Sequence, residues 1–285
     1  MRARAPASSA NLGPGFDTLA LALSLWVEVE MEPAGALSVM ASGQGSDLPT
    51  DGSHLAARVA RDILGHDRVS IRVHSDIPVG RGLGSSAALA AAAAGAAGAD
   101  RLRAHAVASR FDGHPENAAA SVYGGLVAAT LIGGEPLVES LSLDLDLAFV
   151  AVVPDRHLAT EEARRALPAE VSHADARFNL GRLPLLLVGL ADHHRLRSEA
   201  AEDRLHQPYR QALFPEAAPL MAGLVASGAL AACWSGAGPT IVGMIPSAGA
   251  QALCRRGEEL LAELSLPGRC LVLDADREGL VVDGG

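Results

Sequence analysis

The feature that most constrains the fold of this chain is a glycine-rich turn that leads directly into an alanine-rich segment. Glycines alternate at positions 80, 82 and 84, two serines follow, and the sequence is then almost entirely alanine as far as Ala99. This composition strongly favours a helix. Because the helix would carry small side chains on every face, it suits close packing inside a core better than a solvent-exposed position. The segment therefore predicts a loop-to-helix junction within the interior of the fold.

The same junction predicts a phosphate-binding site. Glycine adopts backbone dihedrals closed to other residues and lets a ligand approach the backbone closely. The first amides of a helix lack internal partners and lie at the positive end of its dipole, so they bind anions. A lone glycine triplet often makes only a turn, but a strand, a proline, three glycines, paired serines and an alanine helix form a more specific pattern. The residues expected to form this phosphate site are Pro78, Val79, Gly80, Arg81, Gly82, Leu83, Gly84, Ser85, Ser86, Ala87 and Ala88.

The charged residues and cysteines exclude several classes of protein. All 23 basic residues are arginine, and a Walker-type loop requires a lysine. A formal charge of −10 without a basic block argues against nucleic acid as a partner. The three cysteines have no C-x-x-C spacing, so we expect buried thiols rather than disulfides or a zinc site.

Length and apolar content indicate a folded protein of two domains. Of the 285 residues, 49% are hydrophobic and 20% are charged, which is enough for a buried core. The pattern places a boundary near residue 150, giving domains at 1–150 and 151–285. The most apolar stretches, Ala87–Ala99 and Leu183–Leu190, are shorter than the roughly 20 residues that span a membrane. With no apolar signal core after Met1, we expect a cytoplasmic protein.

Strands and helices alternate along the chain without long linkers. Apolar and alternating runs predict strands at Leu19–Glu32, Val69–His74, Leu147–Val153, Thr240–Ile245 and Leu271–Leu273. Helical spacing predicts helices at Leu55–Leu64 with Ser53 as its cap, and at Thr160–Leu167, Ser172–Arg197 and Cys254–Leu264.

Two further clusters carry side chains suited to ligand binding. Asn11 and Asp17 lie in a glycine-shaped turn where an amide and a carboxylate could grip a hydroxyl and an ammonium group, although a simple capped loop would look the same. Residues 111–117 place two carboxylates, an imidazole and an amide close together. A helix starting at Pro115 would use some of them structurally, whereas a carboxylate among them could hold Mg²⁺.

Several other residues favour simpler interpretations when taken alone. Arg164 and Arg210 stand in mixed stretches and would be solvated surface residues. His193 and His194 lack the partners and spacing of zinc enzymes, so we interpret them as surface residues too. His114 alone favours a local hydrogen bond over a role as a base. The absence of a G-x-S-x-G elbow leaves hydrolase functions without support.

Taken together and in order, these segments resemble the three signature regions of the GHMP kinases, named for galactokinase, homoserine kinase, mevalonate kinase and phosphomevalonate kinase. The resemblance extends over nearly the whole chain. The loop at 82–88 is common to the family, while the turn at 7–17 and the run Gly-His-Pro-Glu-Asn at 113–117 look like the versions found in homoserine kinases. The third motif is matched by Ser-Gly-Ala-Gly-Pro-Thr at 235–240.

The resemblance implies an α+β fold of two domains, an N-terminal one like domain 2 of ribosomal protein S5 and a C-terminal ferredoxin-like one, often as a homodimer. It also implies that ATP and Mg²⁺ serve to phosphorylate the side-chain hydroxyl of L-homoserine, a step of threonine biosynthesis, without a dedicated enzymatic base. Two arginines would clamp the substrate carboxylate. The implied substrate-binding residues are Asn11, Asp17, Asn117, Arg164 and Arg210, with His114, Ser235, Gly236 and Gly238 in support.

Three residues depart from the family's pattern. The family usually has Glu where Asp112 stands and Asp where Glu116 stands, and many relatives carry Glu where Arg110 stands. The candidate Mg²⁺ ligands are therefore Ser86, Asp112 and Glu116, with the choice between the two carboxylates left open. Two alternatives remain: a GHMP kinase that acts on another alcohol, such as mevalonate, and a nucleotide-binding paralogue that has lost catalysis. The adenine site is also open, with His54 and its helix as one candidate.

Overall fold

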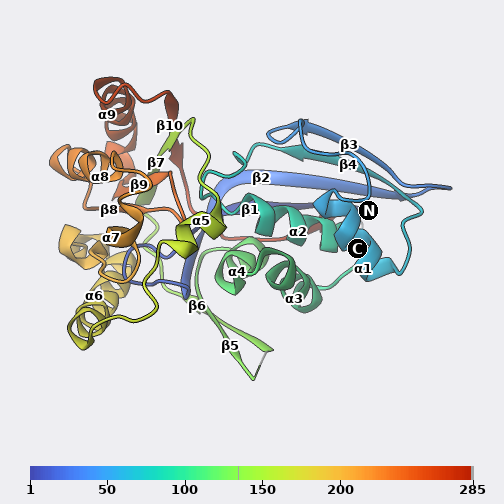
Figure 1. The fold of residues 1–285 in the computed structure, drawn as a ribbon, viewed down its shortest axis with the longest axis horizontal. Coiled ribbons are helices and arrows are strands. Elements are labelled where there is room, and N and C mark those ends of the chain that lie inside the picture. Colours follow the sequence, from blue (N-terminus) through green and yellow to red (C-terminus); the bar gives the residue numbers. More distant parts are fainter. Residues whose placement is uncertain (134, 284–285) are drawn as a thin grey trace.

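The structure, a computed structural model, describes residues 1–133 and 135–283, which fold into two α+β units side by side (Figure 1). The N-terminal unit is built on a mixed seven-stranded sheet of order β11-β1-β2-β4-β3, which β5 and β6 extend from β2. Its strands are β1 (Arg2–Ala10), β2 (Leu19–Pro33), β3 (Ser38–Gly43), β4 (Val69–Ser75), β5 (Leu126–Ile132), β6 (Glu135–Leu141) and β11 (Val281–Asp283).

The long strand β2 is the centre of this sheet. It pairs with β1 along most of its length, with β5 at Leu19–Leu21 and with β4 at Val27–Pro33. In its second half, Val27, Val29 and Met31 are buried while the acidic residues between them are partly exposed. The predicted alternating strand is therefore confirmed.

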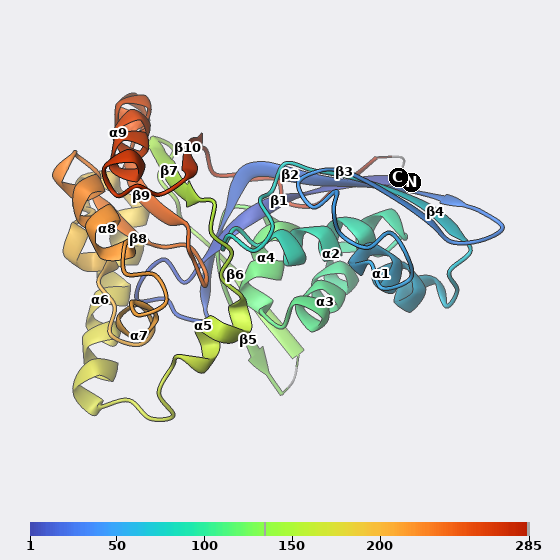
Figure 2. The same cartoon turned by 45° about the horizontal axis from the view of Figure 1, so that its top comes forward.

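Four helices cover one face of the sheet: α1 (Leu55–Leu64), α2 (Ser85–Ala96), α3 (Arg101–Asp112) and α4 (Pro115–Tyr123) (Figure 2). Every residue of α2 from Ala87 to Ala96 is buried, so the predicted interior helix is confirmed. The helix stops before Ala99 because Gly98 takes a left-handed conformation.

The predicted cap of α1 is wrong. His54 occupies the cap position, and its Nδ1 accepts a hydrogen bond of 3.2 Å from the amide of Ala56. Ser53 instead donates to the carboxylate of Asp51, which draws its hydroxyl away from the helix.

The C-terminal unit is a four-stranded antiparallel sheet of order β10-β7-β9-β8. Numbered along the chain, these strands lie in the order 4-1-3-2 with helices after the first and third, which is the ferredoxin-like arrangement. The α+β fold of two units is therefore as the resemblance implied. The strands are β7 (Leu147–Pro154), β8 (Ala231–Trp234), β9 (Ile241–Pro246) and β10 (Gly268–Leu273); the helices are α5 (Thr160–Arg165), α6 (His173–Ala191), α7 (Gln207–Arg210), α8 (Ala217–Ala226) and α9 (Ala250–Glu263).

Two predicted helices of this unit have different ends in the structure. The helix predicted to run to Arg197 ends at Ala191, where the side chain of Asp192 accepts from the amide of His194 and starts a short 3₁₀ turn. The last helix, α9, begins at Ala250, four residues before the predicted start.

The chain crosses between the two sheets twice. The segment 142–146 leads from β6 of the first sheet to β7 of the second, so a boundary near residue 150 falls within β7. After β10 the chain returns, and β11 pairs with β1 at the edge of the first sheet. Arg2, near the start of the chain, accordingly pairs with Asp283, the last residue that the structure describes.

The cysteines and helices agree with two of the expectations from composition. Cys233, Cys254 and Cys270 are free, buried thiols. Among the helices in the described parts of the chain, none combines the length and apolar character that crossing a membrane would require.

Candidate active site

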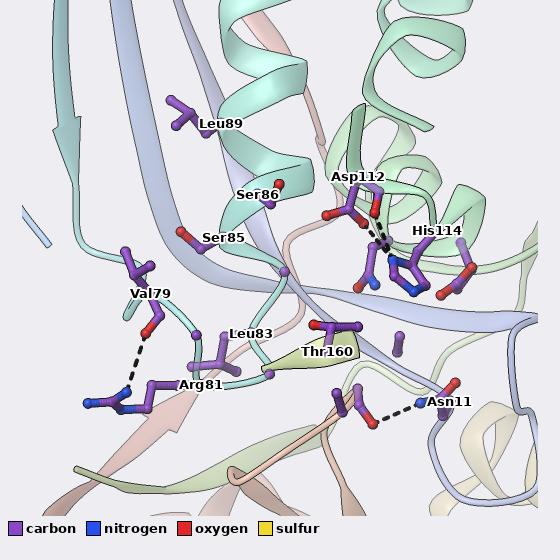
Figure 3. Close-up of a pocket in the computed structure, with 18 of the residues that line it drawn as sticks. Asn11, Val79, Arg81, Leu83, Ser85, Ser86, Leu89, Asp112, His114 and Thr160 are labelled. Carbon is purple, nitrogen blue, oxygen red and sulfur yellow. Dashed lines mark hydrogen bonds and ion pairs between the residues drawn. The ribbon is translucent and has the colours of Figure 1, made fainter. Parts of the chain in front are cut away.

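A cavity of about 290 Å³ lies between the two units, where the glycine loop, the N-terminal turn and α5 meet (Figure 3). Most of the residues singled out from the sequence line it, although they come from segments far apart in the chain. Those lining it are Asn11, Asp17, Val79, Gly80, Arg81, Gly82, Leu83, Gly84, Ser85, Ser86, Asp112, His114, Glu116, Asn117, Arg164, Arg210 and Gly236. Those that do not line it are Pro78, Ala87, Ala88, Ser235 and Gly238.

The glycines of the phosphate loop are required by space as well as by conformation. Gly80, Gly82 and Gly84 all have left-handed φ angles, of 66°, 76° and 64°. A Cβ atom at Gly82 would lie 2.3 Å from the carbonyl oxygen of Ser235, and one at Gly84 would lie 2.0 Å from the hydroxyl of Ser8. The backbone can therefore run this close to its neighbours only with glycine at these positions.

The loop ends at the N-terminus of α2, as the sequence predicted. Among the described residues no side chain caps this helix at Gly84, so its first amides face the cavity without a capping side chain. The hydroxyl groups of Ser85 and Ser86 line the cavity beside these amides. Amides, hydroxyls and the helix dipole together form an anion site that needs no lysine.

The third motif supports the loop from the C-terminal unit. Ser235 donates a hydrogen bond of 2.6 Å from its hydroxyl to the carbonyl of Gly82, and the amide of Thr240 donates to the carbonyl of Arg81 at 3.3 Å. A Cβ at Gly238 would collide with the ring of Trp234 at 2.6 Å. Ser235 and the amide of Thr240 therefore bind the loop from the C-terminal unit, and Gly238 leaves room for the ring of Trp234.

Asn11 has both halves of its side-chain amide engaged within the protein. Its Nδ2 donates to the carbonyl of Gly236 at 2.9 Å, and its Oδ1 accepts from the amide of Asp17 at 3.0 Å. Asn11, Leu12 and Asp17 all have positive φ angles, so the turn is strained and held by these bonds. Asn11 lines the cavity, and in this structure its amide shapes the turn that presents Asp17.

Two arginines and Asp17 add charged groups to the wall of the cavity. Arg164 on α5 donates two hydrogen bonds to the carboxylate of Asp17, at 2.9 and 3.0 Å. Arg210 on α7 is only 3% exposed and donates to the carbonyl of Gly236 at 3.0 Å, so it is not the surface residue that its local sequence suggests. Burial lowers its pKa to about 10, so it stays charged at neutral pH. The ring of Phe16 lies beside both guanidinium groups.

The acidic cluster occupies the turn from α3 to α4. Asp112 ends α3, and Glu116 and Asn117 lie in the first turn of α4. The Nδ1 atom of His114 lies 3.3 Å from the carboxylate of Asp112, which raises the pKa of His114 (Figure 3). Glu116 is 2% exposed, and desolvation raises its pKa to about 7. The Oδ1 of Asn117 accepts from Ser8 at 2.8 Å.

Arg110 does not face this cluster. Its side chain is 60% exposed and pairs with Asp62 of α1 on the outer surface, and it is not among the residues that line the cavity. The cation at this position is therefore not inside the site. Asp112 is the carboxylate that the end of α3 presents to the cavity.

The residues at this turn fit a magnesium ion held together with a nucleotide. The described residues contain no cluster of three His, Cys, Asp or Glu side chains able to enclose a metal alone. However, Oε2 of Glu116 is buried without a hydrogen-bond partner in the described chain, and buried Oδ2 of Asp112 has only the imidazole of His114 beside it, at 3.3 Å. Mg²⁺ is usually held by one or two carboxylates plus the substrate's phosphates. The hydroxyl of Ser86 and the carboxylate of Asp112 or Glu116 are therefore suitable ligands for Mg²⁺.

Some residues of the site were not identified from the sequence. Thr160, at the start of α5, lines the cavity near Asn11 (Figure 3), and Leu48, Leu55 and Leu89 add apolar walls. Buried His206 bonds the carbonyl of Gly13 at 2.8 Å and the guanidinium of Arg210 at 3.1 Å. Nothing local marks these residues, because they enter the site only through contacts between distant segments.

Comparisons with known proteins agree with this geometry. Residues 53–125 match the family described as GHMP kinases N terminal domain, and residues 184–262 match GHMP kinases C terminal. A homoserine kinase from Corynebacterium diphtheriae is 47% identical over 83% of this chain and 83% of its own. One from Desulfitobacterium hafniense is 34% identical over 99% of both chains.

Solved structures show the same fold. The crystal structure of homoserine kinase from Cytophaga hutchinsonii superposes with a TM-score of 0.85 at 22% identity, covering 99% of this chain and 96% of the other. That of L. major mevalonate kinase in complex with R-mevalonate superposes with a TM-score of 0.73 at 14% identity, covering 99% and 96%.

The chain therefore belongs to the GHMP kinases, a family of ATP-dependent small-molecule kinases. Within that family, the relatives that it resembles over most of its length are homoserine kinases.

Proposed function

We propose that this protein transfers the γ-phosphate of ATP to the side-chain hydroxyl of L-homoserine, forming O-phospho-L-homoserine and ADP. One observation carries the proposal: a single cavity is lined both by an anion-binding helix N-terminus and by a pair of opposite charges, Arg164 and Asp17. The curated homoserine kinases that the chain resembles support the same substrate.

The phosphate loop would bind the nucleotide. Its amides and the hydroxyls of Ser85 and Ser86 would bind the triphosphate in place of a lysine. Mg²⁺, held by Ser86 with Asp112 or Glu116, would neutralise charge on the phosphates. The adenine would contact the apolar wall of the same cavity formed by Leu48, Leu55 and Leu89, of which Leu55 begins the helix capped by His54.

The charged pair in the cavity suits a zwitterion. The bidentate pair of Arg164 and Asp17 presents one guanidinium and one carboxylate. A homoserine molecule carries the complementary groups, so its carboxylate would bind Arg164 and Arg210 and its ammonium would bind Asp17. Each protein charge would exchange one partner for another, and neither would be left unpaired.

Transfer would depend on alignment more than on proton chemistry. Phosphoryl transfer has a loose transition state, so positioning and charge stabilisation supply most of the rate. Asn117, whose Nδ2 is not used by the bond to Ser8, would orient the reacting hydroxyl toward the loop. We assign no residue as a dedicated base.

Two alternatives make different predictions. Mevalonate also carries a carboxylate, but it has no ammonium group and would leave Asp17 unpaired once Arg164 turned to the substrate. A silent paralogue would follow from the departures at Arg110, Asp112 and Glu116. Arg110 pairs with Asp62 outside the cavity, while Asp112 and Glu116 both line it, which supports an active kinase.

The test is steady-state ADP release by purified protein with Mg²⁺-ATP and homoserine, mevalonate or threonine. The proposal expects the highest kcat/KM with homoserine, and phosphorus NMR should identify the product as the phosphate ester of its hydroxyl. Turnover with mevalonate alone would overturn the assignment of substrate. Tight ATP binding without turnover on any of the three would favour the silent paralogue.

The family resemblance also suggests a cytoplasmic homodimer. Light scattering coupled to size-exclusion chromatography tests the dimer directly, because the 29.2 kDa chain should then elute with twice that mass.

A further inference from the structure

His105, in the middle of α3, links this helix to α4. Its side chain is fully buried, at 0% exposure, and lies outside the cavity. Its Nε2 atom lies 3.1 Å from the carbonyl oxygen of Pro115, the first residue of α4. The ring also packs edge to face against Tyr123, the last residue of α4, with ring centroids 5.4 Å apart. A single side chain of α3 therefore contacts residues from both ends of α4.

The hydrogen bond to Pro115 accounts for the presence of a histidine here. A carbonyl oxygen can only accept, so Nε2 carries the ring proton and Nδ1 is an acceptor. Nδ1 is buried and has no partner among the described residues, which is costly for a polar atom. Burial also lowers the pKa of His105, which keeps the ring neutral. An apolar residue of similar size would fill this space without the unpaired nitrogen, but it could not donate to Pro115.

The short turn between α3 and α4 needs a restraint such as this hydrogen bond. Only Gly113 and His114 separate α3 from α4, and Gly113 is in the left-handed region with a φ of 80°. A short turn with a conformationally permissive glycine does not by itself fix the angle between two helices. The two sides of this turn carry Asp112 and Glu116, which line the cavity.

We propose that His105 is a positioning residue for the kinase reaction, which fixes Glu116 and Asn117 relative to Asp112 by holding the first turn of α4 against α3. The proposal rests on the proposed function, because it takes these three side chains as the ones that meet the substrates. Displacement of reacting groups by about 1 Å can cost about a hundredfold in rate. Residues that orient ligating side chains typically contribute about tenfold to a hundredfold.

Three variants separate this role from simple packing. His105→Leu fills the same space without a donor, and His105→Gln keeps an N–H group at similar reach. Val107→Ala, at a buried position of the same helix, removes packing without touching the bond to Pro115. Each variant is measured for its melting temperature, for kcat and KM with both substrates, and for homoserine affinity by calorimetry without nucleotide.

We expect His105→Leu to lower kcat/KM for homoserine at least about tenfold and to weaken homoserine binding, with a melting temperature no lower than that of the unaltered protein. His105→Gln should recover most of the loss, and Val107→Ala should lower the melting temperature while kcat/KM stays within about twofold. Unchanged kinetics in the leucine variant, or equal impairment in the leucine and glutamine variants, would overturn the proposal.

If the leucine variant does not fold, His105→Asn replaces it with the same kinetic expectations, because its amide is one methylene too short to reach Pro115; its melting temperature should fall, since the smaller side chain leaves a cavity and a buried amide without a partner. The turnover of the unaltered protein with homoserine is measured first. Its absence would refute the proposed function itself, separately from any comparison of the variants.

Discussion

Replacing Glu116 with glutamine should stabilise the protein above pH 7 and leave its stability nearly unchanged near pH 4. Burial raises the pKa of this carboxyl from 4.5 to about 7, so its ionised form is disfavoured in the folded state. Below pH 4.5 the carboxyl is protonated in both the folded and unfolded states, and folding carries no penalty. As the pH rises from 4.5 to 7, the unfolded carboxyl ionises while the folded one keeps its proton, so stability falls.

The size of the effect follows from the difference between the two pKa values. A difference of about 2.5, at about 1.4 kcal/mol for each pH unit, gives a penalty of about 3 kcal/mol once both states are ionised. Glutamine carries no charge at any pH, so it does not incur this ionisation penalty. Any cost of burying its amide is the same at every pH. The gain in unfolding free energy of Glu116→Gln should therefore grow by about 3 kcal/mol between pH 4 and pH 8.

Urea unfolding at pH 4 and pH 8, without nucleotide and with EDTA present, measures this growth. Glu161→Gln on the exposed face of α5 is the matched control and should change the unfolding free energy by less than about 0.5 kcal/mol at either pH. A gain for Glu116→Gln that is equal at both pH values would refute the argument, because the penalty would then not come from ionisation.

Three other substitutions test separate parts of the site. Gly82→Ala should destabilise the protein by about 1–3 kcal/mol or more and weaken binding of a non-hydrolysable ATP analogue, because its Cβ would meet the carbonyl of Ser235; an unchanged melting temperature would contradict this. Arg164→Lys should raise KM for homoserine about tenfold and leave KM for ATP unchanged, because lysine cannot make the bidentate contact; a matching rise for ATP would show that Arg164 acts on the nucleotide. Arg110→Ala should leave kcat within about twofold, since its exposed ion pair contributes little, and a larger change would indicate that this cation affects the site.

The parts of the fold that the sequence predicts are those with a strong local pattern. The second half of β2 alternates buried and exposed residues because one face of the strand packs on helices. The same alternation of apolar and acidic residues is recognisable in the sequence. Strand β1 (Arg2–Ala10) consists mainly of alanine, serine and arginine, and its last six residues are buried on both faces. No alternation survives there, so the strand cannot be recognised from its own residues. The pairing of β11 with β1 likewise depends on residues almost a chain length apart.

In the candidate site too, some residues can be identified from the local sequence and others cannot. The phosphate loop is predictable because conformation and function both require glycine within one short segment, and a left-handed φ at Gly80, Gly82 and Gly84 bears out the conformational part. Arg210 could not be judged locally, since its burial comes from the carbonyl of Gly236 and from His206, both brought to it by the fold.

The internal pairing of Arg164 with Asp17 links the fold to substrate selection. A ligand that carries only a carboxylate would gain one contact with Arg164 but leave the Asp17 carboxylate without its partner, and a ligand with only an ammonium group would do the converse. Under the proposed function, a zwitterion satisfies both groups at once, so the charges that hold the turn at residues 11–17 to α5 would also discriminate among ligands. The choice of alcohol in this chain would then rest on the ion pair that the two units form, which is the part of the proposal that the Arg164→Lys variant tests.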